Sequence, residues 1–236
     1  AEVVSNKAKE FSFLKDSSYL DESDKAKFNL LIDEIYLKKA DKQAISYVTS
    51  AISSLSLMLY KHFNKQVYVL IDEYDVPLAK AQSYGYHKDM VTLMSSFLGF
   101  LKDPQKDPEK DTSIISKVIL TGCLKVAKNS LFTGVNNFKV NTVLATNKDL
   151  TGIIGFTKDE TLKFLKDYEL ENFSEKVKEH YDGYKFCDKE MFCPWDVVNF
   201  IDENYKYNLN GETDSIRTNN YWLGTTSVKS LYDYLG

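Results

Sequence analysis

Apolar residues recur with two different spacings along the chain, and the change in spacing marks where the secondary structure changes. Over residues 1–62 they return every three or four positions, which predicts helices with one buried side. The stripes that carry this prediction are Phe28, Leu31, Ile32 and Ile35, followed by Ile45, Val48, Ile52, Leu55 and Leu59. At residues 67–71 (VYVLI) this period is lost, and the run is short, β-branched and apolar on both faces. Such a run is typical of a central strand in a parallel sheet, so we expect it to be buried on both sides.

Two further stretches predict strands, and helical patterns separate them. Residues 113–121 (SIISKVILT) form a second strand of the buried type, and residues 139–144 predict a third. Between the first two strands, Pro77 falls in the first turn of a helix, residues 87–101 are periodic, and the polar residues 102–112 predict an exposed loop. Strands that alternate with helices predict a parallel sheet with right-handed crossovers, and hence the α/β class.

Local signals predict where several elements begin. Asp41 is placed to cap a helix, and Thr157 with Glu160 three residues later has the spacing of a capping box. Residues 182–195 predict a hairpin that turns near residues 188 and 189, and Pro194 begins a further helix.

The change of character near residue 155 predicts two domains. The helix and strand alternation ends there, and the remainder is mainly helical. We therefore expect a core over residues 1–150 and a helical lid, or winged-helix-like subdomain, over residues 151–236.

Composition excludes several classes of function. Thirty basic and thirty-four acidic residues give a net charge of −4, so no overall positive field attracts nucleic acid, and we find no direct nucleic-acid signal. No apolar run approaches the length of a membrane span, so we expect no membrane partner. Only three cysteines are present, which favours a reducing, cytoplasmic location. One basic residue, Arg217, is arginine, and the others are lysines.

Carboxylates follow the first predicted strand in the segment VLIDEYDVPL. Asp72 and Glu73 come directly after the apolar run, and Asp75 follows. The carboxyl ends of parallel strands are where open α/β folds bind ligands, and an apolar strand followed by Asp-Glu is the Walker B pattern of nucleoside triphosphatases. In that interpretation Asp72 holds magnesium and Glu73, on the opposite face of the strand, orients or deprotonates water. The alternative is that the acidic pair caps the following helix.

Other polar residues are candidates for the same site. Thr121 ends the second predicted strand, where its hydroxyl would sense the γ-phosphate or form a local turn bond. Lys125 would face the phosphates or be a solvated helix lysine, and Asn136 lies in a loop near the nucleotide or in a simple turn.

Several motifs occur in an order that resembles the AAA-ATPase-like family of P-loop proteins. They are VLIDEYDVPL, LTGCLKVAKNSLFTGVNN, GFTKDET, HYDGYKF followed by MFCPWDVVNFI, and YWLGTTS, over about residues 20–236. The resemblance implies a parallel-sheet P-loop NTPase core with a C-terminal helical lid, and ATP and Mg²⁺ as ligands. It also implies that Asp72 is the metal residue, that Glu73, Thr121 and Lys125 act in catalysis, and that Asp75 and Asn136 help to bind the nucleotide. In full-length members this module commonly precedes a PD-(D/E)XK nuclease-like domain.

The sequence departs from the family in one respect that affects function. The Walker A motif, G-x-x-x-x-G-K-[ST], precedes this region in the family, and the chain contains no such motif. Without it the phosphates lack their cradle of backbone amides and their lysine. Two functions therefore stay open, an ATP-binding ATPase domain fragment that is incompetent alone and a non-catalytic interaction module. The expected partner is a nucleotide, with a protein partner or self-association left open.

Overall fold

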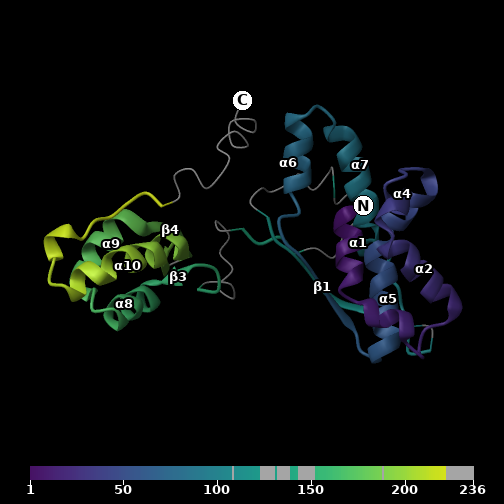
Figure 1. Ribbon diagram of the computed structural model, residues 1–236, viewed down its shortest axis with the longest axis horizontal. Coiled ribbons are helices and arrows are strands. Elements are labelled where there is room, and N and C mark those ends of the chain that lie inside the picture. Colours follow the sequence, from purple (N-terminus) through teal and green to yellow (C-terminus); the bar gives the residue numbers. More distant parts are fainter. Residues whose placement is uncertain (108, 123–130, 132–138, 143–151, 188, 222–236) are drawn as a thin grey trace. The chain divides into compact units, whose positions relative to one another are not determined.

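The computed structural model describes residues 1–107, 109–122, 131, 139–142, 152–187 and 189–221 (Figure 1). Contacts divide the chain into two compact units, and the second begins at Lys139. The domain boundary expected at residue 150 lies outside the described residues. Together the described elements form a mixed α/β structure with a small parallel sheet.

Helices form the first part of unit 1, as the periodicity predicts. They are α1 (Glu2–Lys9), η1 (Ser12–Asp16), α2 (Glu22–Ile32), α3 (Glu34–Leu37), α4 (Lys42–Thr49) and α5 (Ala51–Phe63). Phe28 and Leu31 from the predicted stripe are fully buried in the core that these helices share. The predicted cap at Asp41 is confirmed, because its carboxylate accepts a hydrogen bond from the Ala44 amide at 2.8 Å.

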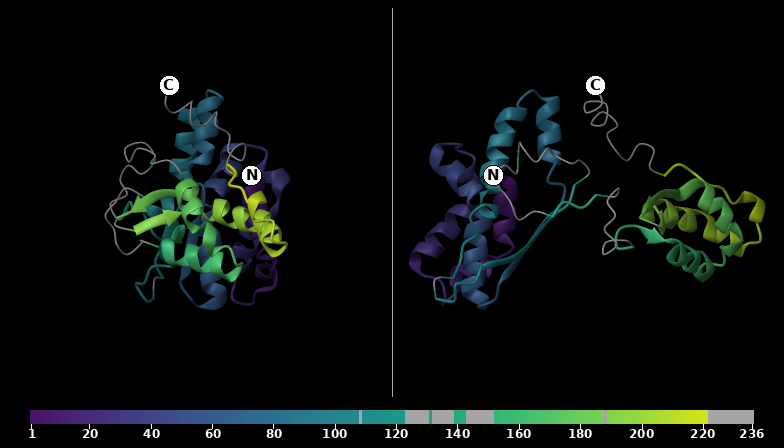
Figure 2. Two further views of the ribbon diagram at one scale, coloured as in Figure 1. Left: turned by 90° about the vertical axis from the view of Figure 1, so that its left-hand side faces the viewer. Right: turned by 180° about the vertical axis from the view of Figure 1, so that it is seen from behind.

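The parallel sheet contains β1 (Val67–Ile71) and β2 (Ile115–Leu120), with Ile71 opposite Leu120. One face of it packs against the helices, which lie on one side of the two strands (Figure 2, right). The other face is exposed at Tyr68, Leu70 and Ile119, which are 69%, 72% and 47% accessible. The expectation that the first strand is buried on both faces is therefore wrong for the described residues, because helices cover only one face. Residues 139–142 carry no strand, and the rest of the predicted third strand lies outside the described residues.

Two helices and a long loop connect β1 to β2. The helices are α6 (Val76–Ser83) and α7 (His87–Phe97), followed by η2 (Gly99–Leu101), and Pro77 lies in the first turn of α6 as predicted. Residues 102–107 and 109–112 lie in the predicted loop. The loop is anchored to α5, because the Asp107 carboxylate accepts a hydrogen bond from the Tyr60 hydroxyl at 2.5 Å.

Unit 2 combines helices with a small antiparallel sheet. Its elements are β3 (Phe156–Thr157), α8 (Lys158–Asp167), η4 (Glu171–Phe173), α9 (Ser174–Tyr181), β4 (Asp182–Phe186), β5 (Lys189–Phe192), α10 (Pro194–Leu209) and η5 (Thr213–Ser215). The strand order is β3-β5-β4. The predicted hairpin, the helix beginning at Pro194 and the capping box are confirmed. In the capping box the Glu160 amide donates to the Thr157 hydroxyl at 3.3 Å, and the Thr157 amide donates to the Glu160 carboxylate at 2.8 Å.

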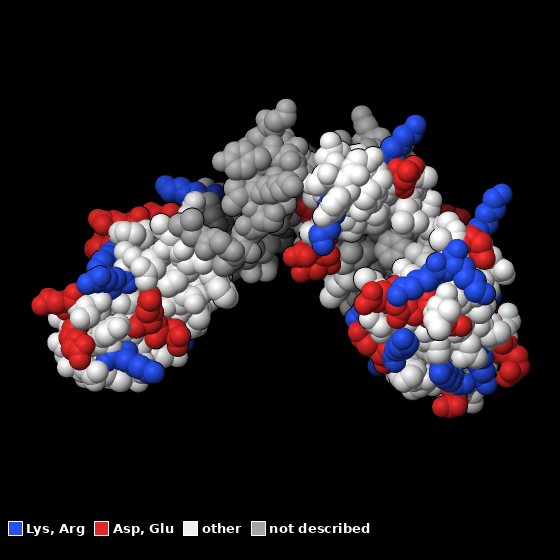
Figure 3. Space-filling view, turned by 45° about the horizontal axis from the view of Figure 1, so that its top comes forward, with Lys and Arg blue, Asp and Glu red and all other residues white. Residues whose placement is uncertain are grey.

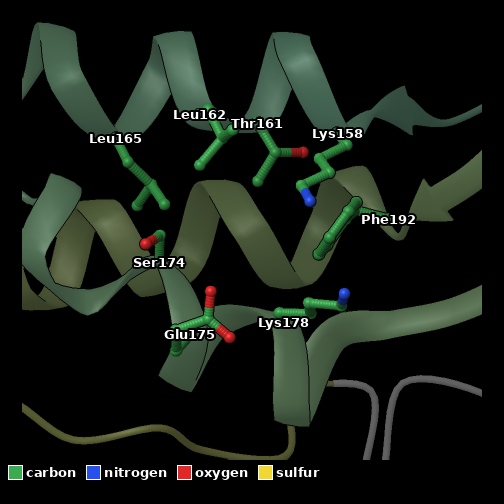
Figure 4. A pocket seen from close by; sticks show the side chains of 8 residues that line it. All are labelled: Lys158, Thr161, Leu162, Leu165, Ser174, Glu175, Lys178 and Phe192. Carbon is green, nitrogen blue, oxygen red and sulfur yellow. The ribbon is translucent and has the colours of Figure 1, made fainter.

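A small cavity of about 20 Å³ lies between α8, α9 and β5 (Figure 4). Thr161 is only 2% exposed, and its hydroxyl, which lines this cavity, has no hydrogen-bond partner among the residues that the structure describes. A cavity of this size has room for one water molecule. The Thr161 hydroxyl is therefore either dry and unsatisfied or bonded to a single water.

Charges of both signs are mixed on the surface of each unit in the view of Figure 3. No helix in the described ranges is long and apolar enough to cross a membrane.

Candidate functional site

The carboxyl ends of β1 and β2 lie side by side, and the chain stays paired just beyond both strands. The Thr121 amide donates to the Ile71 carbonyl at 2.9 Å, and the Tyr74 amide donates to the Thr121 carbonyl at 3.1 Å. These backbone bonds bring residues 72–75 against residues 121 and 122. The sequence prediction that the acidic segment and Thr121 meet at one edge of a parallel sheet is confirmed in position.

Asp72 and Thr121 are joined directly. The Thr121 hydroxyl donates a hydrogen bond to Asp72 Oδ1, and the Glu73 amide donates to the same oxygen at 2.9 Å. Thr121 therefore bonds across the sheet edge to a residue 49 positions away, and not within a local turn. Asp72 does not cap α6 either, since the N-cap residue of that helix is Asp75.

Glu73 has an unusual backbone conformation. Its φ is +52°, in the left-handed region, which costs a non-glycine residue about 1–2 kcal/mol. The prediction that Asp72 and Glu73 alternate across the faces of a strand is wrong, because β1 already ends at Ile71. The turn instead leaves the side chains of Asp72 and Glu73 both exposed to solvent. Strained conformations of this kind cluster at functional sites, but they also end helices, as Asn64 does at the end of α5 with a φ of +51°.

Asp75 differs from the other two carboxylates because it is buried, with 3% of its surface exposed. It lies against Gly122, where an added Cβ would come within 2.5 Å of Asp75 Oδ1 and within 2.8 and 2.9 Å of two ring carbons of Tyr74. Only glycine at position 122 permits this close approach. The contact locks the segment after β1 to the segment after β2. The expected role of Asp75 in nucleotide binding stays a prediction.

Sequence reasoning missed this contact between Gly122, Asp75 and Tyr74. The only signal was the glycine directly after Thr121, which is also common in ordinary turns. Two other predicted site residues, Lys125 and Asn136, lie outside the described residues.

The residues at the edge of the sheet fit magnesium binding that is shared with substrate phosphates and water, and they do not fit a site made of protein ligands alone. Magnesium usually keeps several waters and is held by one or two carboxylates together with substrate phosphates. Asp72 is exposed, and its Oδ2 atom has no hydrogen bond from any described residue, so this oxygen is available as a ligand. A cage made by the protein alone is not seen, because the described residues contain no group of three or more His, Cys, Asp or Glu side chains that could hold a metal.

Comparison with known proteins gives one match. A family model described as "Predicted AAA-ATPase" matches residues 4–132, which is more than half of the chain. The match includes Asp72, Glu73, Asp75, Thr121 and Lys125, whereas Asn136 and unit 2 lie beyond it. No curated protein and no solved structure matches the chain.

Proposed function

Because the chain belongs to the AAA-ATPase-like family, we propose that it carries the metal-binding and water-activating part of an ATPase site. The observation that carries this proposal is the hydrogen bond between the Thr121 hydroxyl and Asp72 at the carboxyl edge of the parallel sheet. Ligands of open α/β sheets bind at the carboxyl ends of the strands, and the Walker B Asp of P-loop NTPases holds Mg²⁺. In this structure the one hydroxyl proton of Thr121 is donated to Asp72, so acting as the sensor requires this hydroxyl to turn towards the γ-phosphate.

Each residue has a distinct role in this proposal. Asp72 offers its unbonded Oδ2 to Mg²⁺, while the Thr121 hydroxyl and the Glu73 amide fix the other oxygen. Glu73, the exposed residue that follows Asp72 in the chain, acts as the base that orients the attacking water. When bound, magnesium neutralises charge on the phosphates of ATP. Asp75 and Gly122 hold the two strand ends together, and Asp75 is a further residue that we propose for nucleotide binding.

The phosphates need a second group of residues, which this sequence does not contain. No G-x-x-x-x-G-K-[ST] motif is present, so the backbone cradle and the phosphate-binding lysine are absent from the chain. We propose that this part of the site comes from protein outside the given sequence, that Lys125 and Asn136 contribute on the nucleotide side, and that unit 2 is the lid. A cytoplasmic location is part of the same proposal.

The same absence favours a second candidate function, a non-catalytic interaction module that retains the fold. In that case Asp72 and Thr121 are a structural pair, and partners bind without nucleotide. The two functions differ in what a longer form of the protein does with Mg-ATP.

The test measures binding of a fluorescent ATP analogue and release of phosphate, with Mg²⁺ present. It uses this chain and a form extended by whatever sequence precedes Ala1 in its gene. We expect the extended form to bind and hydrolyse, and the 236-residue chain to bind far more weakly. In the extended form Asp72→Asn weakens magnesium-dependent binding, whereas Glu73→Gln binds but does not turn over.

Glu22→Gln is a matched control, because Glu22 is an exposed acid on α2 of unit 1 and has no part in the proposed site. It leaves binding and turnover unchanged. If the extended form neither binds nor hydrolyses Mg-ATP, the ATPase proposal is wrong and the interaction module is favoured. Unchanged hydrolysis in Glu73→Gln would remove Glu73 from its role while leaving nucleotide binding in place.

A further inference from the structure

A second site is suggested by a polar groove on unit 2 that the proposed ATPase function does not use. The groove has a volume of about 250 Å³. Residues of α10 and of the segment that follows it form its lining, namely Glu203, Asn204, Tyr207, Ser215, Arg217 and Asn219. It contains the only arginine of a chain whose other basic residues are all lysines.

Asn204 fixes the position of Arg217. This asparagine is 1% exposed, and its Oδ1 accepts from the Arg217 amide at 2.9 Å. Its Nδ2 donates to the Arg217 carbonyl at 3.0 Å and to the Phe200 carbonyl at 2.8 Å. Asn204 thus fixes both the amide and the carbonyl of Arg217 against α10, so the Cα atom that carries the arginine side chain has a defined position at the groove.

Glu203 is fixed in a similar way by its neighbours. Its Oε2 atom accepts from the Tyr221 hydroxyl at 2.5 Å and from Asn219 Nδ2 at 2.7 Å. Burial and the hydrogen bond to Glu203 raise the pKa of Tyr221, so this hydroxyl remains a donor at neutral pH. The other carboxylate oxygen, Oε1, has no hydrogen bond from any residue that the structure describes.

The two opposite charges line one groove without pairing. No ion pair joins Glu203 to Arg217, and the guanidinium of Arg217 meets no acceptor in the described part of the chain. A simple anion at Arg217 would also meet the Glu203 carboxylate, and a simple cation at Glu203 would meet the guanidinium. A ligand that carries both charges satisfies both residues.

We propose that this groove binds a small zwitterion of the α-amino acid class. Arg217 forms the paired hydrogen bonds that a guanidinium makes with a carboxylate, and Glu203 accepts from the ammonium group. The hydroxyls of Tyr207 and Ser215, which also line the groove, supply further hydrogen bonds. Because Glu203 and Arg217 are both exposed to solvent, we expect millimolar affinity.

The test is a titration of the ¹⁵N-labelled chain followed by amide chemical shifts, with no nucleotide present. The probes are glycine, acetate and methylammonium, each at the same ionic strength. We expect glycine to shift the amides of α10 and of residues 215–219 in a saturable way, and the two singly charged probes to leave them unchanged. Arg217→Gln and Glu203→Gln each weaken glycine binding by about tenfold or more, since each removes a charged hydrogen-bonding group.

Two further variants test whether a loss of glycine binding reflects only a change of surface charge or a loss of folding in unit 2. Lys206→Gln removes a nearby exposed charge of α10 that does not line the groove, and it should bind glycine like the unaltered chain. Arg217→Lys keeps the charge but loses the paired hydrogen bonds, and its amide spectrum reports whether unit 2 stays folded. The proposal is overturned if acetate or methylammonium binds as tightly as glycine, if glycine never saturates, or if Lys206→Gln loses as much affinity as Arg217→Gln. These outcomes are independent of whether the chain takes part in ATP hydrolysis.

Discussion

Replacing Gly122 by alanine should disturb the candidate site more than its small size suggests. The new Cβ would lie 2.5 Å from Asp75 Oδ1, and 2.8 and 2.9 Å from two ring carbons of Tyr74. Ordinary contacts between such atoms are about 3.5–4.0 Å, so the neighbours must move by about 1 Å. Asp75 is buried and has little room to move away.

The size of the effect follows from these contacts. Forcing an extra methyl group into a packed site costs about 1–3 kcal/mol. For a chain of this length about 1 kcal/mol lowers the melting temperature by about 2–4 °C, so we expect a loss of about 2–12 °C. Because residues 72–75 are paired with residues 121 and 122, the shift also displaces Asp72 from Thr121.

Thermal and urea unfolding of the two variants Gly122→Ala and Gly99→Ala provide the assay. Gly99 is the matched control, because an added Cβ there would meet no atom within 4 Å and its φ needs no glycine. We expect Gly99→Ala to change the free energy of unfolding by no more than about 0.5 kcal/mol. A double variant with Asp75→Ser tests the cause: removing the carboxylate should cost less in the Gly122→Ala background than in the unaltered chain.

Equal stability of Gly122→Ala and Gly99→Ala would refute the close packing of Gly122 against Asp75. Strict additivity of Gly122→Ala and Asp75→Ser would show that the clash lies elsewhere. Either result would remove the proposed lock between the two strand ends.

Three further predictions concern other parts of the chain. The hydrogen bond from Tyr60 is the main reason that the pKa of Asp107 lies below its ordinary value of 3.8. The Asp107 carboxylate therefore stabilises the folded protein above pH 3.8, and this stabilisation is lost as the pH falls through the lower pKa of the folded state. Melting temperatures of the unaltered chain and Asp107→Asn should therefore differ at neutral pH and converge well below pH 3.8; a constant difference would contradict this. Thr157→Ala should lower the free energy of unfolding of unit 2 by about 1 kcal/mol. Glu160→Ala, which removes the capping acceptor, should cost less in the Thr157→Ala background than in the unaltered chain, because the two side chains cap α8 together; full additivity would argue against the capping box. Thr161→Val should stabilise unit 2 by about 1 kcal/mol, because the Thr161 hydroxyl lines the cavity of Figure 4 without a hydrogen-bond partner among the described residues; a loss of stability would refute the prediction that this hydroxyl is dry.

Features set by local chemistry or by strand direction were predictable from the sequence. Asp41, Thr157 and Pro194 mark helix beginnings through side-chain or ring chemistry that acts within a few residues. The meeting of Asp72 with Thr121 required that the two strands be parallel and adjacent, because their carboxyl ends then lie next to each other at one edge.

Contacts between residues far apart in sequence were not predictable. Tyr60 and Asp107 are 47 positions apart, and no sequence pattern around either residue predicts the other as its hydrogen-bond partner. The left-handed conformation of Glu73 was also missed, because glutamate has no preference for that region and only the pairing of its neighbours imposes it.

The two faces of β1 show how contacts that the sequence does not predict affect the support of Asp72. Leu70 is as apolar as the residues on the covered face and Tyr68 adds an aromatic ring, and burying a side chain such as Leu70 fully stabilises a protein by about 1.5–3 kcal/mol. The strand sequence therefore specifies burial on both faces, but it cannot specify which segment covers each one. Within the described residues the helices cover one face only, so packing from a single side supports the edge that carries Asp72. The position of Asp72 then depends strongly on contacts along the edge itself, namely the Thr121 bond and the approach of Asp75 to Gly122. For that reason a single methyl group at Gly122 should affect Asp72 as well as stability.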